Sequence, residues 1–288
     1  MISRVLATFV LLSIPLSSLG IRFDPSDAPV GPDSRVPASD TYVFVHGVAQ
    51  AAWAWYRIET MFQESGFNTM AIDLTGHGKD KTKADSVTTL SFYAKPLTDY
   101  LASSKKKVIL VAHGLGGAPA SYAMEAYPEK IAKAVFLSAV MPLSGESSLD
   151  LLKDKFPALK ENCYVVNYNN PANPHPTSVM MNMTNSRYFY YNRSPVQDVT
   201  LAEHLLEETP WAVFYDDMKL TDANYGSIHR YFIRTGEDRV IPWDLQQSII
   251  DHNPPQKFFT LKNGDHSAFF SETPWLFKLL KEISYIQD

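Results

Sequence analysis

Cysteine is almost absent from this sequence: Cys163 is the only one among 288 residues. An intramolecular disulfide is therefore excluded, and so are the cysteine-rich zinc sites. The histidines are scattered, with no His-x-His spacing and no pair four residues apart. Because zinc sites built on histidine need such spacings, the sequence predicts no metal centre.

Long stretches of one charge sign are also missing. The chain has 26 Lys and Arg against 31 Asp and Glu, a formal net charge of -5. Its only dense basic run, 105–107, precedes an apolar strand-like segment and is typical of a solvated turn. Nucleic-acid binding is therefore not expected. No Gly-x-Gly-x-x-Gly follows the first predicted strand, so no dinucleotide site is indicated and no cofactor is expected.

The N-terminus has the pattern of a targeting segment. Arg4 precedes an apolar stretch, 5–16, that is interrupted by Pro15 and followed by Ser18-Leu-Gly20. This stretch is short for a membrane span, so we expect a cleaved signal peptide over residues 1–20 rather than stable membrane insertion; a signal-anchor is the alternative. Residues 21–40 are rich in Pro, Asp and Ser and are predicted to be a linker.

A signal peptide predicts a secreted protein or one that follows the secretory pathway. Two glycosylation acceptor patterns agree with that location: Asn182-Met-Thr and Asn192-Arg-Ser. Since such patterns mark surface asparagines of secreted proteins, the chain is expected to be a glycoprotein.

A hydrophobic content of 45% is ample for a packed core. In the first half, apolar strand-like segments (42–45, 67–74, 108–111, 131–141) alternate with helical patterns (51–62, 90–101). Alternation resumes with a strand at 229–234, a helix at 243–250, a strand at 257–261 and a helix at 275–286. The pattern predicts the α/β class, with a mostly parallel sheet flanked by helices. Residues 41–141 and 226–288 are assigned to this core.

Between the two halves, residues 142–225 lack the alternation. Helix-like pieces at 149–159 and 201–208 flank a middle rich in Tyr, Asn and Pro. We expect a small cap over the sheet. The aromatic residues either form the cap's own core or line an apolar pocket, since ligand sites favour apolar walls with few polar groups. Both interpretations stay open.

The segment that carries most information is Val108-Ile-Leu-Val-Ala-His-Gly-Leu-Gly-Gly117. An apolar strand runs into small residues and then into a helix-compatible segment, the pattern of a nucleophile elbow, Gly-x-Ser-x-Gly. Ala112 and Gly116 let the strand and helix backbones approach closely. The central position, which should hold the attacking hydroxyl, is Gly114. Ser121 lies about two helical turns away, and Cys163 falls in the predicted cap, so neither replaces the serine.

Three further features directly follow predicted strands, at the sheet edge where α/β proteins bind ligands. They are Val48 in His-Gly-Val, Asp238 in Thr-Gly-Glu-Asp, and His266 in Asn-Gly-Asp-His. Together with Gly114 they follow the chain order nucleophile position, acid, histidine, which is that of α/β-hydrolases. Glu237 is the nearest competitor for the acid position, and Asp265 is a weaker one.

These motifs resemble an α/β-hydrolase of the plant-type methylesterase, hydroxynitrile lyase and methylketone synthase group. The resemblance rests on Val45-His-Gly-Val48, Ala52-Trp-Ala-Trp-Tyr56 and Phe136-Leu-Ser-Ala-Val-Met-Pro142, and it covers residues 41–288. It implies that His266 is a general acid and base oriented by Asp238, and that the N–H groups of Val48 and Leu115 form an oxyanion hole. Ser267 stands where lyase members carry a lysine, which argues against cyanohydrin cleavage.

Three functions follow from the missing serine. The first is an enzyme that acts on a small carbonyl compound, an ester or a β-keto acid, without an acyl-enzyme, by lyase-type chemistry or by direct attack of water. The second is an inactive relative that binds a small apolar ligand. The third is an ordinary esterase in which Gly114 is a substitution. Loss of the nucleophile costs about a million-fold in turnover in a serine protease, so covalent hydrolysis is not expected. The sequence does not indicate an oligomeric state.

Overall fold

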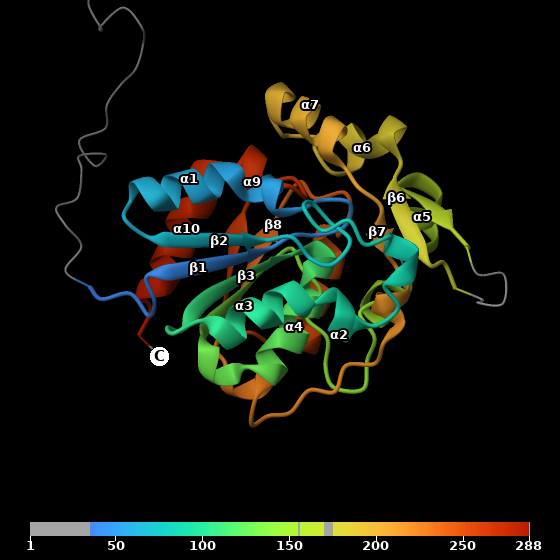
Figure 1. Cartoon of the computed structure of the whole chain (residues 1–288). Helices are drawn as coiled ribbons and strands as arrows, with labels where there is room; N and C mark the ends of the chain where they lie inside the picture. The colour runs from blue at the N-terminus through green and yellow to red at the C-terminus, as the bar shows by residue number, and fades with distance from the viewer. Residues whose placement is uncertain (1–34, 155, 170–174, 288) are drawn as a thin grey trace, which may run out of the picture. The chain divides into compact units, whose positions relative to one another are not determined.

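A six-stranded sheet forms the centre of the protein, whose computed structural model describes residues 35–154, 156–169 and 175–287 (Figure 1). The strand order is β2-β1-β3-β4-β8-β9, and every neighbouring pair is parallel. The strands are β1 (Thr41–Val45), β2 (Asn68–Ile72), β3 (Val108–His113), β4 (Ile131–Leu137), β8 (Arg230–Thr235) and β9 (Lys257–Leu261). The predicted α/β class with a parallel central sheet is confirmed.

Helices cover both faces of this sheet (Figure 1). On one face lie α1 (Tyr56–Glu64), α9 (Ala268–Ser271) and α10 (Thr273–Tyr285); on the other lie α2 (Leu90–Tyr93), α3 (Lys95–Ser103) and α4 (Gly117–Ala126). α8 (Trp243–His252) follows β8 in the chain. The helical periodicity read from the sequence explains the packing: Ile58 and Phe62 of α1 are fully buried, and so are Leu276, Leu280 and Ile283 of α10. β3 is buried along its whole length, as expected of a central strand covered on both faces.

One predicted helix is divided in the structure. The segment 90–101 forms α2 and α3, which meet at Ala94, and Pro96 stands in the first turn of α3. Proline has no N–H to donate to the preceding turn, so a new helix begins there instead of the first one continuing.

The segment between Pro142 and Tyr225 contains structure that the sequence did not predict. Strands β5 (Tyr164–Asn167), β6 (Ser178–Met181) and β7 (Thr209–Pro210) form a separate antiparallel sheet. α5 (Phe156–Asn162), α6 (Met183–Phe189) and α7 (Val196–Leu205) accompany it. The predicted helix 149–159 is instead a 3-10 turn, η7 (Asp150–Leu152), followed by α5. Residues 37–288 form one compact unit, and the cap boundaries 142–225 stay a prediction.

Short 3-10 turns complete the elements, and several of them lead into the helices above. They are η3 (Ala52–Trp55), η4 (Ala84–Ser86), η5 (Gly114–Gly116), η6 (Pro128–Lys130), η8 (Ala212–Tyr215) and η9 (Tyr225–Ser227).

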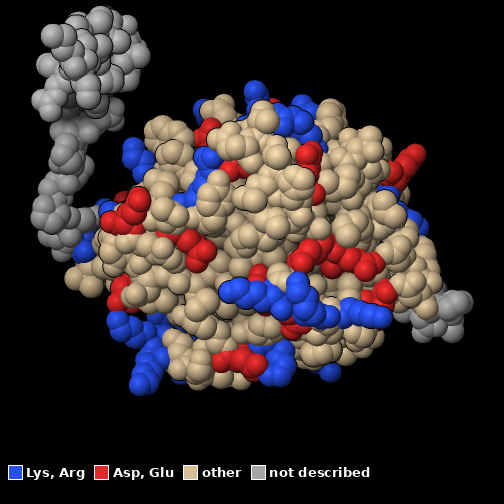
Figure 2. Space-filling view, turned by 45° about the horizontal axis from the view of Figure 1, so that its top comes forward, with Lys and Arg blue, Asp and Glu red and all other residues tan. Residues whose placement is uncertain are grey.

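The predicted signal peptide, 1–20, and most of the predicted linker, 21–40, lie outside the described residues. Among the helices that are described, none combines the length and the apolar character needed to cross a bilayer. On the face drawn in Figure 2, basic and acidic side chains are interspersed around a large uncharged area, and a row of basic side chains lies below this area with acidic side chains beside it.

Candidate active site

His266 and Asp238 form a hydrogen-bonded pair beyond the carboxyl ends of the strands. Asp238 follows β8 and His266 follows β9, two neighbouring strands of the sheet. The His266 Nδ1 lies 2.8 Å from Oδ2 of Asp238, and both side chains are buried. Since a carboxylate only accepts, Nδ1 carries the proton and donates it to Asp238. The other ring nitrogen, Nε2, is then free to act as a base.

The Asp238 carboxylate is held by four hydrogen bonds. Its Oδ1 accepts from the backbone N–H groups of Val240 and Ile241, each at 2.8 Å. Its Oδ2 accepts from the Thr235 hydroxyl at 3.0 Å in addition to His266. These bonds satisfy a buried charge and fix the direction from which it can orient the imidazole.

A glutamine that the sequence did not single out fixes this loop. Gln246 of α8 is fully buried. Its Oε1 accepts from the Thr235 N–H at 3.0 Å, and its Nε2 donates to the carbonyl oxygens of Thr235 at 3.0 Å and Ile241 at 2.7 Å. Gln246 therefore ties the two ends of the Asp238 loop together. The local sequence, Trp243-Asp-Leu-Gln-Gln247, does not distinguish this buried glutamine from its more exposed neighbours.

Gly114 directly follows β3 and has a φ of +56°, in the left-handed region that favours glycine. A Cβ atom placed on it would stand 3.3 Å from Nε2 of His266. The structure thus brings Gly114 and His266 together across the site. The backbone at this position has the sharp strand-to-helix turn expected of an elbow.

The glycines after Gly114 are required by close approach of backbones. A Cβ on Gly116 would overlap the carbonyl oxygen of His46, and one on Gly117 would overlap that of Val140. Gly114 itself accepts a hydrogen bond from the Val140 N–H at 3.0 Å. The turn after β3 is therefore packed directly against the loops after β1 and β4, which places Val48 and Leu115 beside Gly114.

Two buried histidines orient the loops around the site. Nε2 of His113 lies 2.8 Å from the carbonyl oxygen of His266, so it donates there and fixes the backbone of the catalytic candidate. His46 accepts from the Leu74 N–H on Nε2, and its Nδ1 lies 2.9 Å from the Gly47 carbonyl. Burial lowers the pKa of His46 to about 4 and holds the pKa of His113 well below its usual value. Both rings are therefore neutral, and the hydrogen bond that His46 accepts on Nε2 requires this.

A narrow cavity lies between these groups and the cap. It is lined by Val48, Gly114, Leu115, Leu152, Leu159, Tyr164, Tyr190, Val240, Ile241 and His266. Its volume is about 10 Å³, which is roughly the space that one water molecule requires. Four of the five residues that the sequence assigned to the site thus line the same small space, and the fifth, Asp238, does not line it. The two tyrosines were among the aromatic residues noted in the sequence, without a role.

The other candidates lie elsewhere. Glu237 is partly exposed and pairs with Arg193 at 3.3 Å. The Asp265 carboxylate accepts from the N–H of Arg193 and the hydroxyl of Ser194, both at 2.8 Å, and does not contact the imidazole of the neighbouring histidine. Cys163 is buried, and burial raises the pKa of its thiol to about 12. It is therefore not an activated nucleophile.

Neither glycosylation candidate is a free surface side chain. The oxygen of Asn182 accepts from the Thr184 N–H at 3.1 Å and caps α6. Asn192 donates its amide to the Glu237 carbonyl at 3.1 Å, and its own oxygen is buried.

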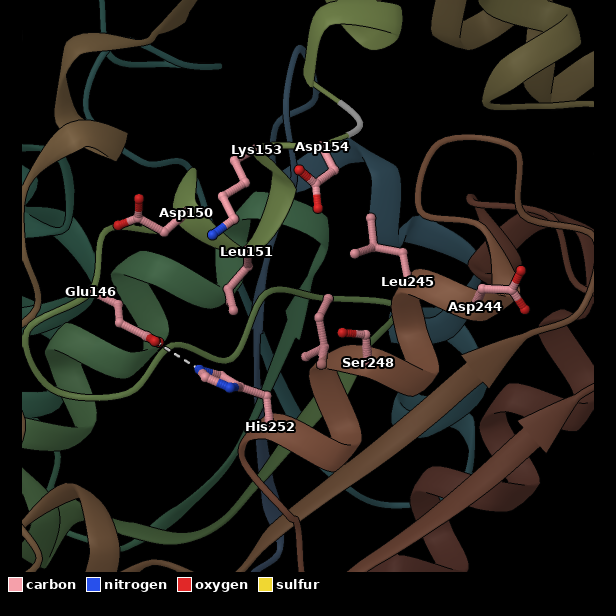
Figure 3. Close-up of a pocket in the computed structure, with 10 residues that line it drawn as sticks. Glu146, Asp150, Leu151, Lys153, Asp154, Asp244, Leu245, Ser248 and His252 are labelled. Atoms are coloured by element: carbon pink, nitrogen blue, oxygen red, sulfur yellow. Dashed lines mark hydrogen bonds and ion pairs between the residues drawn. The ribbon is translucent and has the colours of Figure 1, made fainter.

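A second cavity of about 380 Å³ lies between the segment 146–154 and α8 (Figure 3). The figure shows Glu146 joined to His252, with Lys153 and Asp154 pointing into the same groove. Oε1 of Glu146 and Nε2 of His252 are 2.7 Å apart. None of the residues proposed from the sequence lines this groove. Across the described parts of the chain, no group of three or more His, Cys, Asp or Glu side chains gathers as a metal site.

Residues 42–276 match the family described as Alpha/beta hydrolase family. The chain belongs to this family. It is 42% identical over 249 residues to candidate methylesterase 11 of Arabidopsis thaliana, an alignment that covers 85% of the chain and 64% of that relative. The chain spans less than two thirds of the length of this relative and of the next two, methylesterases 13 and 15.

Solved structures of plant proteins have the same fold. The methylesterase MES16 from Arabidopsis superposes with a TM-score of 0.76 at 32% identity, covering 85% of this chain and 99% of that one. Tomato methylketone synthase I complexed with 2-tridecanone superposes with a TM-score of 0.79, also at 32% identity, covering 86% and 99%. The predicted relationship to plant methylesterases and methylketone synthases is therefore confirmed at the level of the family.

The comparisons overturn the predicted location. Methylesterases 11, 13 and 15 of Arabidopsis, at 40–42% identity, are all named as chloroplastic. They point to a plastid, so the prediction of a secreted protein was wrong, and the glycosylation and signal-peptide predictions lose their support. An apolar stretch after a basic residue is a weak signal, because transit peptides are also basic and poor in acidic residues.

Proposed function

We propose that this protein is an enzyme that acts on a small carbonyl compound without forming an acyl-enzyme. The observation that carries the proposal is the position of the His266 Nε2. It faces Gly114, while Nδ1 is held by Asp238. A base and the acid that orients it thus face the position at which the family's nucleophile would stand. Glycine at that position has no side-chain atom that could attack a carbonyl group.

The roles follow from this geometry. Asp238 fixes the tautomer and direction of His266, and Nε2 of His266 accepts or donates the proton in flight. The N–H groups of Val48 and Leu115 stabilise negative charge on the carbonyl oxygen, helped by the positive end of the helix that starts after Gly114.

Decarboxylation of a β-keto acid fits this site best. The bond between the α-carbon and the carboxylate breaks, CO₂ leaves, and the electron pair moves onto the ketone oxygen as an enolate. The enolate then takes, at carbon, the proton that Nε2 of His266 accepted from the carboxyl group of the acid, which gives a methyl ketone and returns His266 to its neutral form. No nucleophile is needed. Similar solved structures of tomato methylketone synthase I contain β-ketoheptanoate or 2-tridecanone, which supports an apolar carbonyl compound as the ligand.

Hydrolysis of a methyl ester by water is the second candidate. It is favoured by the methylesterase relatives and by the space for one water beside Gly114. A substrate that filled this space would displace the water, so we rank hydrolysis second. We also propose a plastid as the location, from the names of the same relatives.

One experiment separates these functions. The full chain is incubated with 3-oxooctanoic acid and, separately, with its methyl ester, and mass spectrometry identifies 2-heptanone or methanol. We expect ketone formation from the acid that falls by about 10²–10⁴-fold in His266→Ala and changes little in Gly114→Ala. Equal rates for His266→Ala and wild type would refute the proposal. Methanol release from the ester, without ketone formation from the acid, would favour hydrolysis. Binding without turnover of either compound would favour the inactive relative.

A further inference from the structure

Two tyrosines from different parts of the cap meet at the wall of the site cavity. Tyr164 begins β5, and Tyr190 ends α6. Their hydroxyl oxygens are 2.6 Å apart, and both side chains are buried. Both residues line the cavity beside Gly114. The Tyr190 ring also stands edge-on to the His266 imidazole, with ring centroids 5.0 Å apart and an interplanar angle of 87°.

The two hydroxyl groups supply two O–H donors, but only one hydrogen bond joins them. Each hydroxyl carries one O–H, and the bond between the two oxygens uses only one of them. Among the residues that the structure describes, no other side chain or carbonyl group accepts from either hydroxyl. One O–H of the pair is therefore unpaired at a buried position. A buried donor without an acceptor is unfavourable, so such a group in a native structure calls for an explanation, such as a catalytic role or a bound water or ion.

The pair is a stable donor. Burial raises the pKa of Tyr164 above its usual value and that of Tyr190 well above it. The negative charge of Asp238 adds to the effect at Tyr164. Both hydroxyls therefore keep their protons throughout the physiological range, and neither becomes a base that competes with His266.

We propose that the Tyr164–Tyr190 pair donates a hydrogen bond to a second oxygen of the bound carbonyl compound. This inference rests on the proposed function, because the first oxygen is the one held by Val48 and Leu115. The unpaired O–H has no acceptor in the described protein, and the cavity that both tyrosines line is where an acceptor can reach it. The remaining wall is apolar, from Leu152, Leu159, Val240 and Ile241. The ligand class is a carbonyl compound with one further acceptor oxygen on an otherwise apolar chain.

Two ketones of equal length test this inference. In 5-propoxypentan-2-one an ether oxygen replaces one CH₂ of 2-nonanone, and because this oxygen is not attached to the carbon β to the carbonyl, neither compound can eliminate an alcohol. Their dissociation constants are measured with the full chain by ligand-observed NMR. A neutral hydrogen bond contributes about 1 kcal/mol, so we expect the ether to bind about fivefold more tightly. A substitution that weakens the binding of both ketones equally leaves the ratio of the two dissociation constants unchanged. The ratio therefore reports only on the ether oxygen.

The variants Tyr164→Phe and Tyr190→Phe identify the donor. The double variant removes both O–H groups and should give a ratio near one. Each single variant leaves one O–H without a protein acceptor, so the single variant that keeps the higher ratio shows which remaining tyrosine reaches the ligand. Tyr191→Phe is the matched control. Tyr191 is equally buried, but its hydroxyl accepts from Gln50 at 3.3 Å and it does not line the cavity, so the ratio should persist.

Three outcomes would overturn the inference: a wild-type ratio of one, a fivefold ratio that survives in the double variant, or no binding of either ketone. If the double variant fails to fold, as judged by thermal unfolding, the combination of Tyr164→Phe with Tyr190→Leu, which also removes both O–H groups, replaces it. Turnover of 3-oxooctanoic acid is measured separately. A tyrosine-dependent ratio without turnover would refute the proposed catalysis and leave the hydrogen bond to the ligand standing.

Discussion

Nε2 of His266 lies 3.3 Å from the position that a Cβ atom would occupy on Gly114. A serine there would carry its hydroxyl within hydrogen-bonding reach of the imidazole. The φ of +56° at Gly114 costs an L-residue about 1–2 kcal/mol but costs glycine almost nothing. The site therefore keeps the backbone shape of a nucleophile position while the strain that a nucleophile would impose is relieved.

A serine at position 114 should introduce covalent chemistry. We expect Gly114→Ser to hydrolyse p-nitrophenyl acetate at least about 10³-fold faster than wild type, because losing a catalytic serine costs up to about 10⁶-fold. Gly114→Ala is the control, since it adds the same backbone strain without the oxygen. A burst of p-nitrophenol should appear only in the serine variant. Equal rates for the two variants would mean that His266 cannot activate an oxygen at this position.

The turn after β3 should tolerate no side chain at Gly116. An added methyl group would meet the His46 carbonyl, a backbone atom that cannot turn away. We expect Gly116→Ala to lower the free energy of unfolding by about 3 kcal/mol. Gly145→Ala is the control: its φ is +86°, but nothing lies within 4 Å of the added atom, so the cost should be about 1 kcal/mol. Urea unfolding measures both, and equal losses would contradict the close approach.

Acid should destabilise the protein through its buried histidines. Burial lowers the pKa of His46 to about 4, against 6.5 for an unperturbed imidazole. Between these values the unfolded chain binds the proton that the folded chain excludes. The contribution of the neutral His46 to the free energy of unfolding is therefore fully present above pH 6.5 and is lost as the pH drops towards 4. The loss from His46 alone is about 2 kcal/mol at pH 5.

His77 and His113, whose pKa values burial also lowers, should add to this loss. The measurement is the free energy of unfolding between pH 7.5 and 5. His46→Gln should reduce its slope with pH by up to one proton, whereas His204→Gln, at an exposed position, should leave it unchanged. If the free energy of unfolding had the same slope with pH in the wild type, His46→Gln and His204→Gln, the acid-dependent loss could not be assigned to His46.

An ion pair fastens α7 to α1. Asp198 of α7 is buried, and the Arg57 guanidinium lies 2.9 Å from its carboxylate. Removing the cation leaves a buried charge without a partner, so Arg57→Ala should cost about 3–5 kcal/mol in the free energy of unfolding. Lys106→Ala, which breaks the exposed pair with Asp40, should cost no more than about 1 kcal/mol. Denaturant unfolding checks both, and similar costs would show that the Tyr56 hydroxyl, 2.6 Å from Asp198, is sufficient alone.

The core of the fold could be predicted because its signals are local. Strands such as 257–261 are apolar runs between turn residues, and the structure reproduces that strand residue for residue. Asp238 and His266 could be placed near each other because both follow strands of one parallel sheet. The cap sheet could not be predicted. β7 has only two residues, and β5 pairs with β6 although the sequence between them, 168–177, is rich in Asn and Pro. None of these strands therefore has a periodic pattern of its own.

The roles of single cap tyrosines were also beyond the sequence. Tyr188 and Tyr190 are two residues apart in the same aromatic run, yet Tyr188 is exposed and Tyr190 is buried against His266. The difference depends on how α6 ends and on where Tyr164 lies, 26 residues earlier. Long-range placement of this kind is set by tertiary packing and leaves no mark in the local pattern.

A cavity of about 10 Å³ has a consequence for kinetics. The space among Leu152, Leu159, Tyr164 and Tyr190 is too small for a carbonyl compound. A ligand therefore enters only during the fraction of time in which these side chains have moved apart. The apparent dissociation constant is then the intrinsic one divided by that fraction. At high ligand concentration the observed association rate should stop rising and level off at the rate of opening. The turnover of the proposed enzyme then cannot exceed the rate at which these side chains move apart.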